Sequence, residues 1–152
     1  MEGLRSLLLG HFTGVDELHA SPWSEAQTAR VEMSCTAELG DALIVMRVTE
    51  TRPAGSFDAL NVFMTDRDTG EVLLYGFDDL GYPPEPPARG RYANAQIDLL
   101  RSTPRGHSRT TFTRTATGLR WSKQFRPAAD EAWQPVVTGT LQRDAAAADR
   151  SS

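Results

Sequence analysis

The sequence predicts an all-β protein that folds as a closed antiparallel up-and-down barrel of about ten strands. Short segments with alternating apolar and polar residues recur along the chain, and glycine, proline, asparagine or aspartate separates them. Helical spacing occurs in one short N-terminal segment, which leaves no source for the crossover helices that a parallel sheet needs. Closure of the barrel would also remove the exposed edges that make an all-β chain prone to aggregation.

The N-terminal segment predicts a two-turn helix that leads into the first strand. Leu4, Leu7 and Leu8 follow the i, i+3, i+4 spacing of one helix face, and Gly10 stands where a helix commonly ends. Such a short helix is unstable alone, so we expect it to cap one end of the barrel.

Ten strands are expected after this helix, each ending at residues typical of turns. Four prolines within residues 78–87 exclude a central strand there and make this long loop a candidate lid. Residues 1–143 would form one barrel domain and residues 144–152 a disordered tail. The expected strands are residues 12–20, 28–38, 42–51, 59–65, 71–77, 90–92, 96–101, 108–115, 119–126 and 136–143.

The amino-acid composition and the net charge limit the classes of molecule that we expect this protein to bind. A chain of 152 residues with 39% hydrophobic and 24% charged residues fits one soluble domain. The net charge of −4 gives no general attraction to nucleic acid or to an anionic membrane, so we expect neither as a partner. No apolar run approaches a membrane span, and Leu4 to Leu9 is too short for a signal peptide, which favours a cytoplasmic location.

Several pieces of the chain resemble known β-barrels. The opening Gly10-x-Phe12-x-Gly14 is similar to the Gly-x-Trp opening of calycins, with Phe12 in place of the tryptophan. More of the chain resembles a bacterial family with a lipocalin-like barrel, and the resemblance implies a fold and an interior cavity but no reaction. The matching pieces are residues 8–14, Ser21-Pro22-Trp23, residues 66–72 and residues 133–143.

Asp16 is the first candidate site residue. The resemblance to nitrobindin-like barrels, which open with Gly-x-Trp-x-Gly-x-Gly, implies that this face of the first strand points inward, with Asp16 at the position of the last glycine. Burial would raise the pKa of such a carboxyl group, as in general acids and bases. The alternative is that Asp16 faces solvent or lies at the wet end of its strand.

Lys123 is the second candidate and the only lysine of the chain. It shares an apolar strand face with Leu119, Trp121 and Phe125, so it could pair with Asp16, bind an anionic group or act as a base. The alternative is that its stem packs on Trp121 while the ammonium group reaches the barrel mouth.

The remaining candidates are aromatic residues and methionine expected to line the interior, since such side chains are common in small-molecule pockets. Ordinary core packing explains each of them as well. Tyr75 is also a candidate for proton transfer. The expected ligand-binding residues are Phe12, Trp23, Met46, Phe63, Tyr75, Phe77 and Trp121.

We expect no metal and no cofactor. His11 and His19 are eight residues apart on one strand, too far to share a metal ion. The acidic residues at 66–71 and at 78–79 do not match an EF-hand loop. Haem-binding nitrobindins use a histidine from the C-terminal part of the barrel, and this chain has none after His107.

These observations favour a barrel that binds a small, largely apolar molecule in its interior. One alternative is a cyclase or isomerase of bacterial specialised metabolism that uses the same cavity, with Asp16, Lys123 or Tyr75 as catalytic groups. Another is a structural or interaction protein with a filled core. Homodimer formation stays open.

Overall fold

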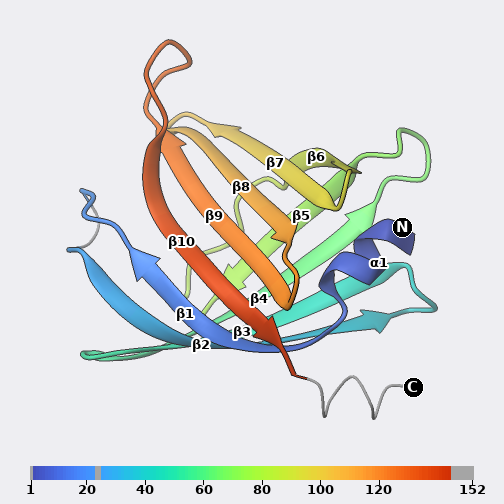
Figure 1. Ribbon diagram of the computed structural model, residues 1–152. Helices are drawn as coiled ribbons and strands as arrows, with labels where there is room; N and C mark the ends of the chain where they lie inside the picture. Colours follow the sequence, from blue (N-terminus) through green and yellow to red (C-terminus); the bar gives the residue numbers. More distant parts are fainter. Residues whose placement is uncertain (1, 23–24, 145–152) are drawn as a thin grey trace.

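The computed structural model describes residues 2–22 and 25–144, and it confirms the closed antiparallel barrel (Figure 1). The strands follow one another around the barrel in chain order, and β1 closes the ring by pairing with β10. Within these residues the elements are α1 (Glu2–Leu8), β1 (Gly10–Leu18), β2 (Gln27–Glu38), β3 (Leu43–Arg52), β4 (Gly55–Thr65), β5 (Val72–Asp78), β6 (Ala88–Ala93), β7 (Gln96–Thr103), β8 (Gly106–Arg114), β9 (Gly118–Arg126) and β10 (Gln134–Arg143).

The strand register decides which side chains point inward. Directly opposite residues of antiparallel strands share one face of the sheet. Phe12 of β1 lies opposite Met33 of β2 and Arg143 of β10, and both Phe12 and Met33 are buried. The face of β1 that carries Phe12 and Asp16 is therefore the interior face.

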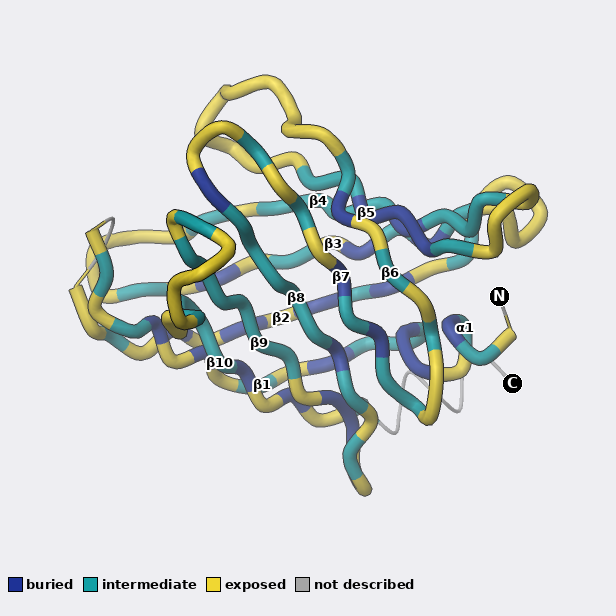
Figure 2. The backbone as a smooth tube through the Cα atoms, turned by 90° about the horizontal axis from the view of Figure 1, so that it is seen from above, coloured by how far each residue is buried: buried dark blue, intermediate teal, exposed yellow. Residues whose placement is uncertain are grey.

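Helix α1 covers one end of the barrel, as expected, and its buried leucines are Leu4, Leu7 and Leu8 (Figures 1 and 2). Gly10 has a φ of 131°, a conformation that favours glycine, and this lets the chain turn from the helix into β1. Arg143 at the end of β10 donates hydrogen bonds to the carbonyl oxygens of Leu9 and, at 3.3 Å, of Leu7. The last carbonyls of a helix lack partners within the helix, so Arg143 caps α1.

The half of the barrel next to α1 is filled by apolar side chains. Phe63 of β4 packs edge-on against Phe112 of β8 with ring centroids 5.7 Å apart, and Phe112 stacks on Trp121 of β9 at 6.0 Å. We call the opposite end, where β1, β3, β7 and β9 finish, the mouth. The inward-facing polar residues Asp16, Glu50 and Lys123 lie in this half, so the interior has an apolar end and a polar end.

Strand bounds differ from the expected ones by one or two residues in most cases. The largest difference is β4, which begins at Gly55 rather than at residue 59. Residues 53–54 form a tight turn, and β3 and β4 pair as far as Arg52 opposite Gly55. The predicted tail, apart from Asp144, lies outside the described residues, as does Trp23. Within the described part, no helix is long and apolar enough to span a bilayer.

Candidate functional site

Asp16 is inside the barrel and its side chain is 0% exposed. The indole Nε1 of Trp121 donates a hydrogen bond to Oδ1 of Asp16 at 2.8 Å. Gly139 of β10 lies between these residues in the register, and a Cβ atom there would collide with both Asp16 Oδ1 and Trp121 Nε1. The missing side chain at Gly139 therefore lets Trp121 reach Asp16 across β10.

A second buried carboxyl group, that of Glu50 in β3, lies beside Asp16. Glu50 is 7% exposed, and its Oε2 is 3.3 Å from Nη2 of Arg52. Burial raises the pKa of Asp16 to about 7; the Trp121 hydrogen bond opposes this shift, and the neighbouring Glu50 adds to it. Within the described residues, Asp16 Oδ2 and Glu50 Oε1 have no hydrogen-bond partner. One proton held between the two carboxyl groups would satisfy both oxygens.

Glu50 and Arg52 were not identified from the sequence, although a signal exists. Both share strand parity with Ile44 and Met46, which are buried. The strand is apolar on both faces near its start, so alternation alone did not show which face points inward.

Lys123 lies on the inner face of β9, opposite Thr110 of β8 and Val137 of β10. Burial and then the nearby Arg101 lower the pKa of Lys123, while Glu85 opposes this shift. No carboxylate of the described residues forms an ion pair or a hydrogen bond with its ammonium group, which excludes a direct pair with Asp16 in this structure.

A cavity of about 230 Å³ opens at the mouth beside Lys123. Its walls include Arg101 of β7, Ser108 of β8, Phe125 of β9 and Val136 of β10. A larger and more open hollow of about 450 Å³ lies on the outside of β3, β4 and β5. The outer hollow is lined by Phe77 and lies outside the barrel, whereas the mouth cavity lies at the end of the barrel and contains Lys123, so the mouth cavity is the candidate site.

The proline-rich loop between β5 and β6 forms one wall of the mouth cavity through Glu85. Nε of Arg101 donates a hydrogen bond to the Pro86 carbonyl oxygen at 2.7 Å. Nη1 of Arg101 is 3.7 Å from Oε2 of Glu85. Arg101 therefore ties this loop to the mouth; neither Arg101 nor Glu85 was identified from the sequence, because their proximity depends on where the loop folds.

Phe12, Met46 and Phe63 point into the barrel, as expected, and belong to its packed apolar end. Tyr75 and Phe77 lie on the outer face, opposite Val62 and Leu60 of β4, which differs from the interior position expected for both.

The difference arises from the composition of β5, which is apolar on both faces, so only its pairing with β4 decides the orientation. Leu74 and Gly76 take the inner positions, opposite Phe63 and Asn61. Phe77 is 44% exposed.

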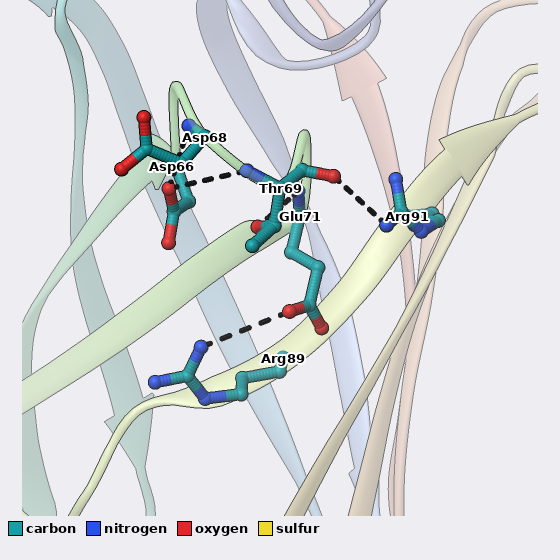
Figure 3. Close-up of polar contacts among 6 residues, drawn as sticks. All are labelled: Asp66, Asp68, Thr69, Glu71, Arg89 and Arg91. Carbon is teal, nitrogen blue, oxygen red and sulfur yellow. Dashed lines mark hydrogen bonds and ion pairs between the residues drawn. The ribbon is translucent and has the colours of Figure 1, made fainter.

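The acidic residues at the β4–β5 hairpin form turn contacts (Figure 3). Oδ1 of Asp66 accepts hydrogen bonds from the backbone N–H groups of Asp68, at 2.9 Å, and Thr69, at 3.4 Å. These bonds hold the pKa of Asp66 below its usual value. Glu71 points to Arg89 at 3.9 Å. The described residues contain no group of three or more potential metal ligands.

His11 takes an outward position on β1, and His19 directly follows that strand. Nε2 of His19 lies 3.0 Å from the Thr138 hydroxyl, and Nδ1 of His11 lies 3.6 Å from the Asp144 carboxylate. Neither histidine faces the mouth cavity.

No family model matches this sequence, and no curated protein matches it either. Among solved structures, the crystal structure of Rv2717c from M. tuberculosis is similar in fold, with a TM-score of 0.71. The two chains are 17% identical, and the match covers 95% of this chain and 98% of that chain. At this identity the likeness shows the fold alone, a closed antiparallel barrel.

Proposed function

We propose that this protein binds a small, largely apolar molecule in the barrel interior at the mouth. The observation that carries the proposal is the cavity of about 230 Å³, which joins the half-buried Lys123 to the apolar wall of Phe125 and Val136. Small-molecule sites combine apolar walls with placed polar groups; here Phe125 and Val136 are the apolar lining, and the other lining residues are polar, charged or glycine. We also propose that the protein is related to the calycins, whose opening Gly10-x-Phe12-x-Gly14 resembles, and to the bacterial lipocalin-like family. A cytoplasmic location is part of the same proposal.

The size of the cavity sets the size of the ligand. Its volume of about 230 Å³ is smaller than the roughly 300–1,000 Å³ of pockets that enclose drug-sized ligands. Phe63, Phe112 and Trp121 pack against one another deeper in the barrel, which leaves the mouth as the place for the ligand. The proposal is therefore for a compact ligand.

Filling the cavity tests the proposal. Ser108→Trp places an indole among the cavity walls, whereas Gln124→Trp places it on the outer face of the neighbouring strand. Titration of 1-hexanol, followed by ¹H–¹⁵N NMR, is expected to shift the amides of Ser108, Phe125 and Val136 in the wild type and in Gln124→Trp. Loss of these shifts only in Ser108→Trp supports the site; shifts spread evenly over the surface contradict it. Native mass spectrometry of protein from its source checks for a retained small molecule.

A second candidate function is acid–base catalysis in the same half of the barrel, as in a cyclase or isomerase. The observation that favours it is the Asp16 carboxyl group, whose pKa burial raises to about 7, a value suited to a general acid or base at neutral pH. Because Asp16 is 0% exposed, a substrate would have to replace the contact with Trp121 or Glu50. Turnover that survives both Asp16→Asn and Lys123→Met would contradict this function.

A further inference from the structure

We propose that the mouth cavity holds an anionic group of its ligand, a carboxylate or a phosphate, between Lys123 and Arg101. The same anionic group would replace the Glu85 carboxylate at Arg101. This inference rests on the proposed function, because it names the chemistry of the molecule that the mouth cavity binds.

The charge of the cavity walls points to an anion. Three cationic side chains, Arg101, Arg105 and Lys123, line the cavity together with one carboxylate, Glu85. The whole chain, in contrast, has a net charge of −4. The positive lining is therefore local to the mouth, where it would attract an anion against the charge of the whole protein.

The side-chain nitrogen of Lys123 has no ion-pair or hydrogen-bond partner among the described residues. Its stem lies on the inner face of β9, opposite Thr110 and Val137, neither of which is charged. Partial burial of this side chain lowers its pKa, because removal from water disfavours the charged form. An anion in the cavity would supply the missing partner and favour the charged form of Lys123.

Arg101 can bind an anion while it keeps its contact with the loop. Nε is used by the Pro86 carbonyl oxygen, at 2.7 Å, and Nη1 faces Glu85. Nη2 donates no hydrogen bond to a described residue. The two terminal nitrogens, Nη1 and Nη2, can together donate two parallel hydrogen bonds to one carboxylate or phosphate.

The carboxylate of Glu85 already lies beside Arg101, but the ion pair between them is weak. The distance is 3.7 Å and the Glu85 side chain is 48% exposed, so the ion pair contributes little to stability. Pro84 and Pro86 flank Glu85 and restrict the backbone of the loop. A ligand anion that contacts both Arg101 and Lys123 can therefore displace the side chain of Glu85 while the loop stays in place.

Ligands with the same alkyl chain and different head groups test the inference on the full-length protein. Isothermal titration calorimetry is expected to show hexanoate or hexyl phosphate binding at least about tenfold more tightly than 1-hexanol, and hexylammonium more weakly than 1-hexanol. The ratio of the two anions decides whether the site prefers a carboxylate or a phosphate. Inorganic phosphate measures the contribution of the head group alone.

Variants locate the effect. Lys123→Met removes the charge and keeps an apolar stem, and it is expected to abolish the preference for the anion over 1-hexanol. Arg120→Met is the matched control, because Arg120 lies on the outer face of the same strand. Glu85→Gln is expected to tighten anion binding several-fold by removing the competing carboxylate. ¹H–¹⁵N spectra of each variant confirm that the barrel is folded.

The outcomes separate the two proposals. If neither hexanoate nor 1-hexanol binds, the proposed function is wrong. If 1-hexanol binds as tightly as hexanoate, or if Lys123→Met keeps the anion preference, the cavity binds ligands but the anion site is refuted. If Glu85→Gln weakens anion binding, the displacement of Glu85 is refuted.

Discussion

The buried carboxyl group of Asp16 makes the stability of the folded state dependent on pH. Aspartate in an unfolded chain ionises near pH 3.9, whereas burial raises the pKa of Asp16 in the barrel to about 7. The folded state therefore holds a proton that the unfolded state has already lost between these values. The stabilisation from this group is complete below about pH 4, decreases as the pH rises, and is lost above about pH 7.

Asp16→Asn is expected to remove this dependence. The asparagine amide can donate to Glu50 and its carbonyl oxygen can accept from Trp121 without a titrating group. The variant should become more stable than the wild type as the pH rises from 4 to 8. At pH 8 the gain in the free energy of unfolding should be on the order of 3–4 kcal/mol, since one pKa unit corresponds to about 1.36 kcal/mol. Urea unfolding at both pH values measures the difference. Glu17→Gln, on the exposed face of β1, is the control; an equal gain in both variants contradicts the role of Asp16.

Gly139 illustrates how a missing side chain supports a polar contact. Gly139→Ala places a methyl group against Asp16 Oδ1 and Trp121 Nε1 and separates them. We expect a loss of about 2–4 kcal/mol, because overpacking alone costs roughly 1–3 kcal/mol and the hydrogen bond is lost as well. Urea unfolding and the NMR shift of the Trp121 indole N–H report both effects. Thr140→Ala changes the adjacent exposed residue, and the same loss there would mean that the Asp16–Trp121 contact is not the cause.

At the scale of elements, helix α1 depends on β10 for its C-terminal cap. Arg143→Gln removes the hydrogen bonds that the guanidinium group donates to the carbonyl oxygens of Ser6, Leu7 and Leu9. We expect a loss of about 1–3 kcal/mol and faster hydrogen exchange in α1.

Arg114→Gln is the matched control, because Arg114 bonds the Ser6 hydroxyl at 2.8 Å and no carbonyl of the helix. Equal exchange in α1 of both variants would show that the backbone cap is unimportant.

At the scale of the whole molecule, the barrel is closed by seams of unequal length. β5 and β6 share three register pairs, from Val72 opposite Gly90 to Leu74 opposite Ala88, whereas β3 and β4 share ten. A short seam supplies fewer inter-strand hydrogen bonds, so opening of the barrel should begin there. The loop that connects β5 and β6 carries Glu85, and Glu85 lines the mouth cavity. The short seam is therefore continuous with the loop beside this cavity.

Native-state hydrogen exchange tests where the barrel opens. Amides of β6 and of residues 75–78 are expected to exchange faster than those in the centres of β2 and β3, and a ligand at the mouth should slow them. Equal protection in β3 and β6 would contradict opening at the β5–β6 seam.

The order of the strands, the capping helix and the inward face of β9 followed from the sequence alone. Turn residues and alternation are local properties, and Trp121, Lys123 and Phe125 stand on a strand whose two faces differ clearly in polarity. The orientation of Tyr75 and Phe77 did not follow, because β5 is apolar on both faces and its register with β4 fixes their direction.

The sequence by itself determined a closed barrel with a capping helix and made Asp16 and Lys123 candidates for its interior, with Asp16 in solvent and Lys123 at the barrel mouth as the alternatives. Only the tertiary structure decided what lies beside them. Glu50 reaches Asp16, and Arg101 and Glu85 reach the mouth beside Lys123, from strands and a loop that are distant in the chain. Alternation separates the two faces of each strand. The strand register in the closed barrel decides which inward side chains lie at the same level, and therefore which charged groups surround the cavity.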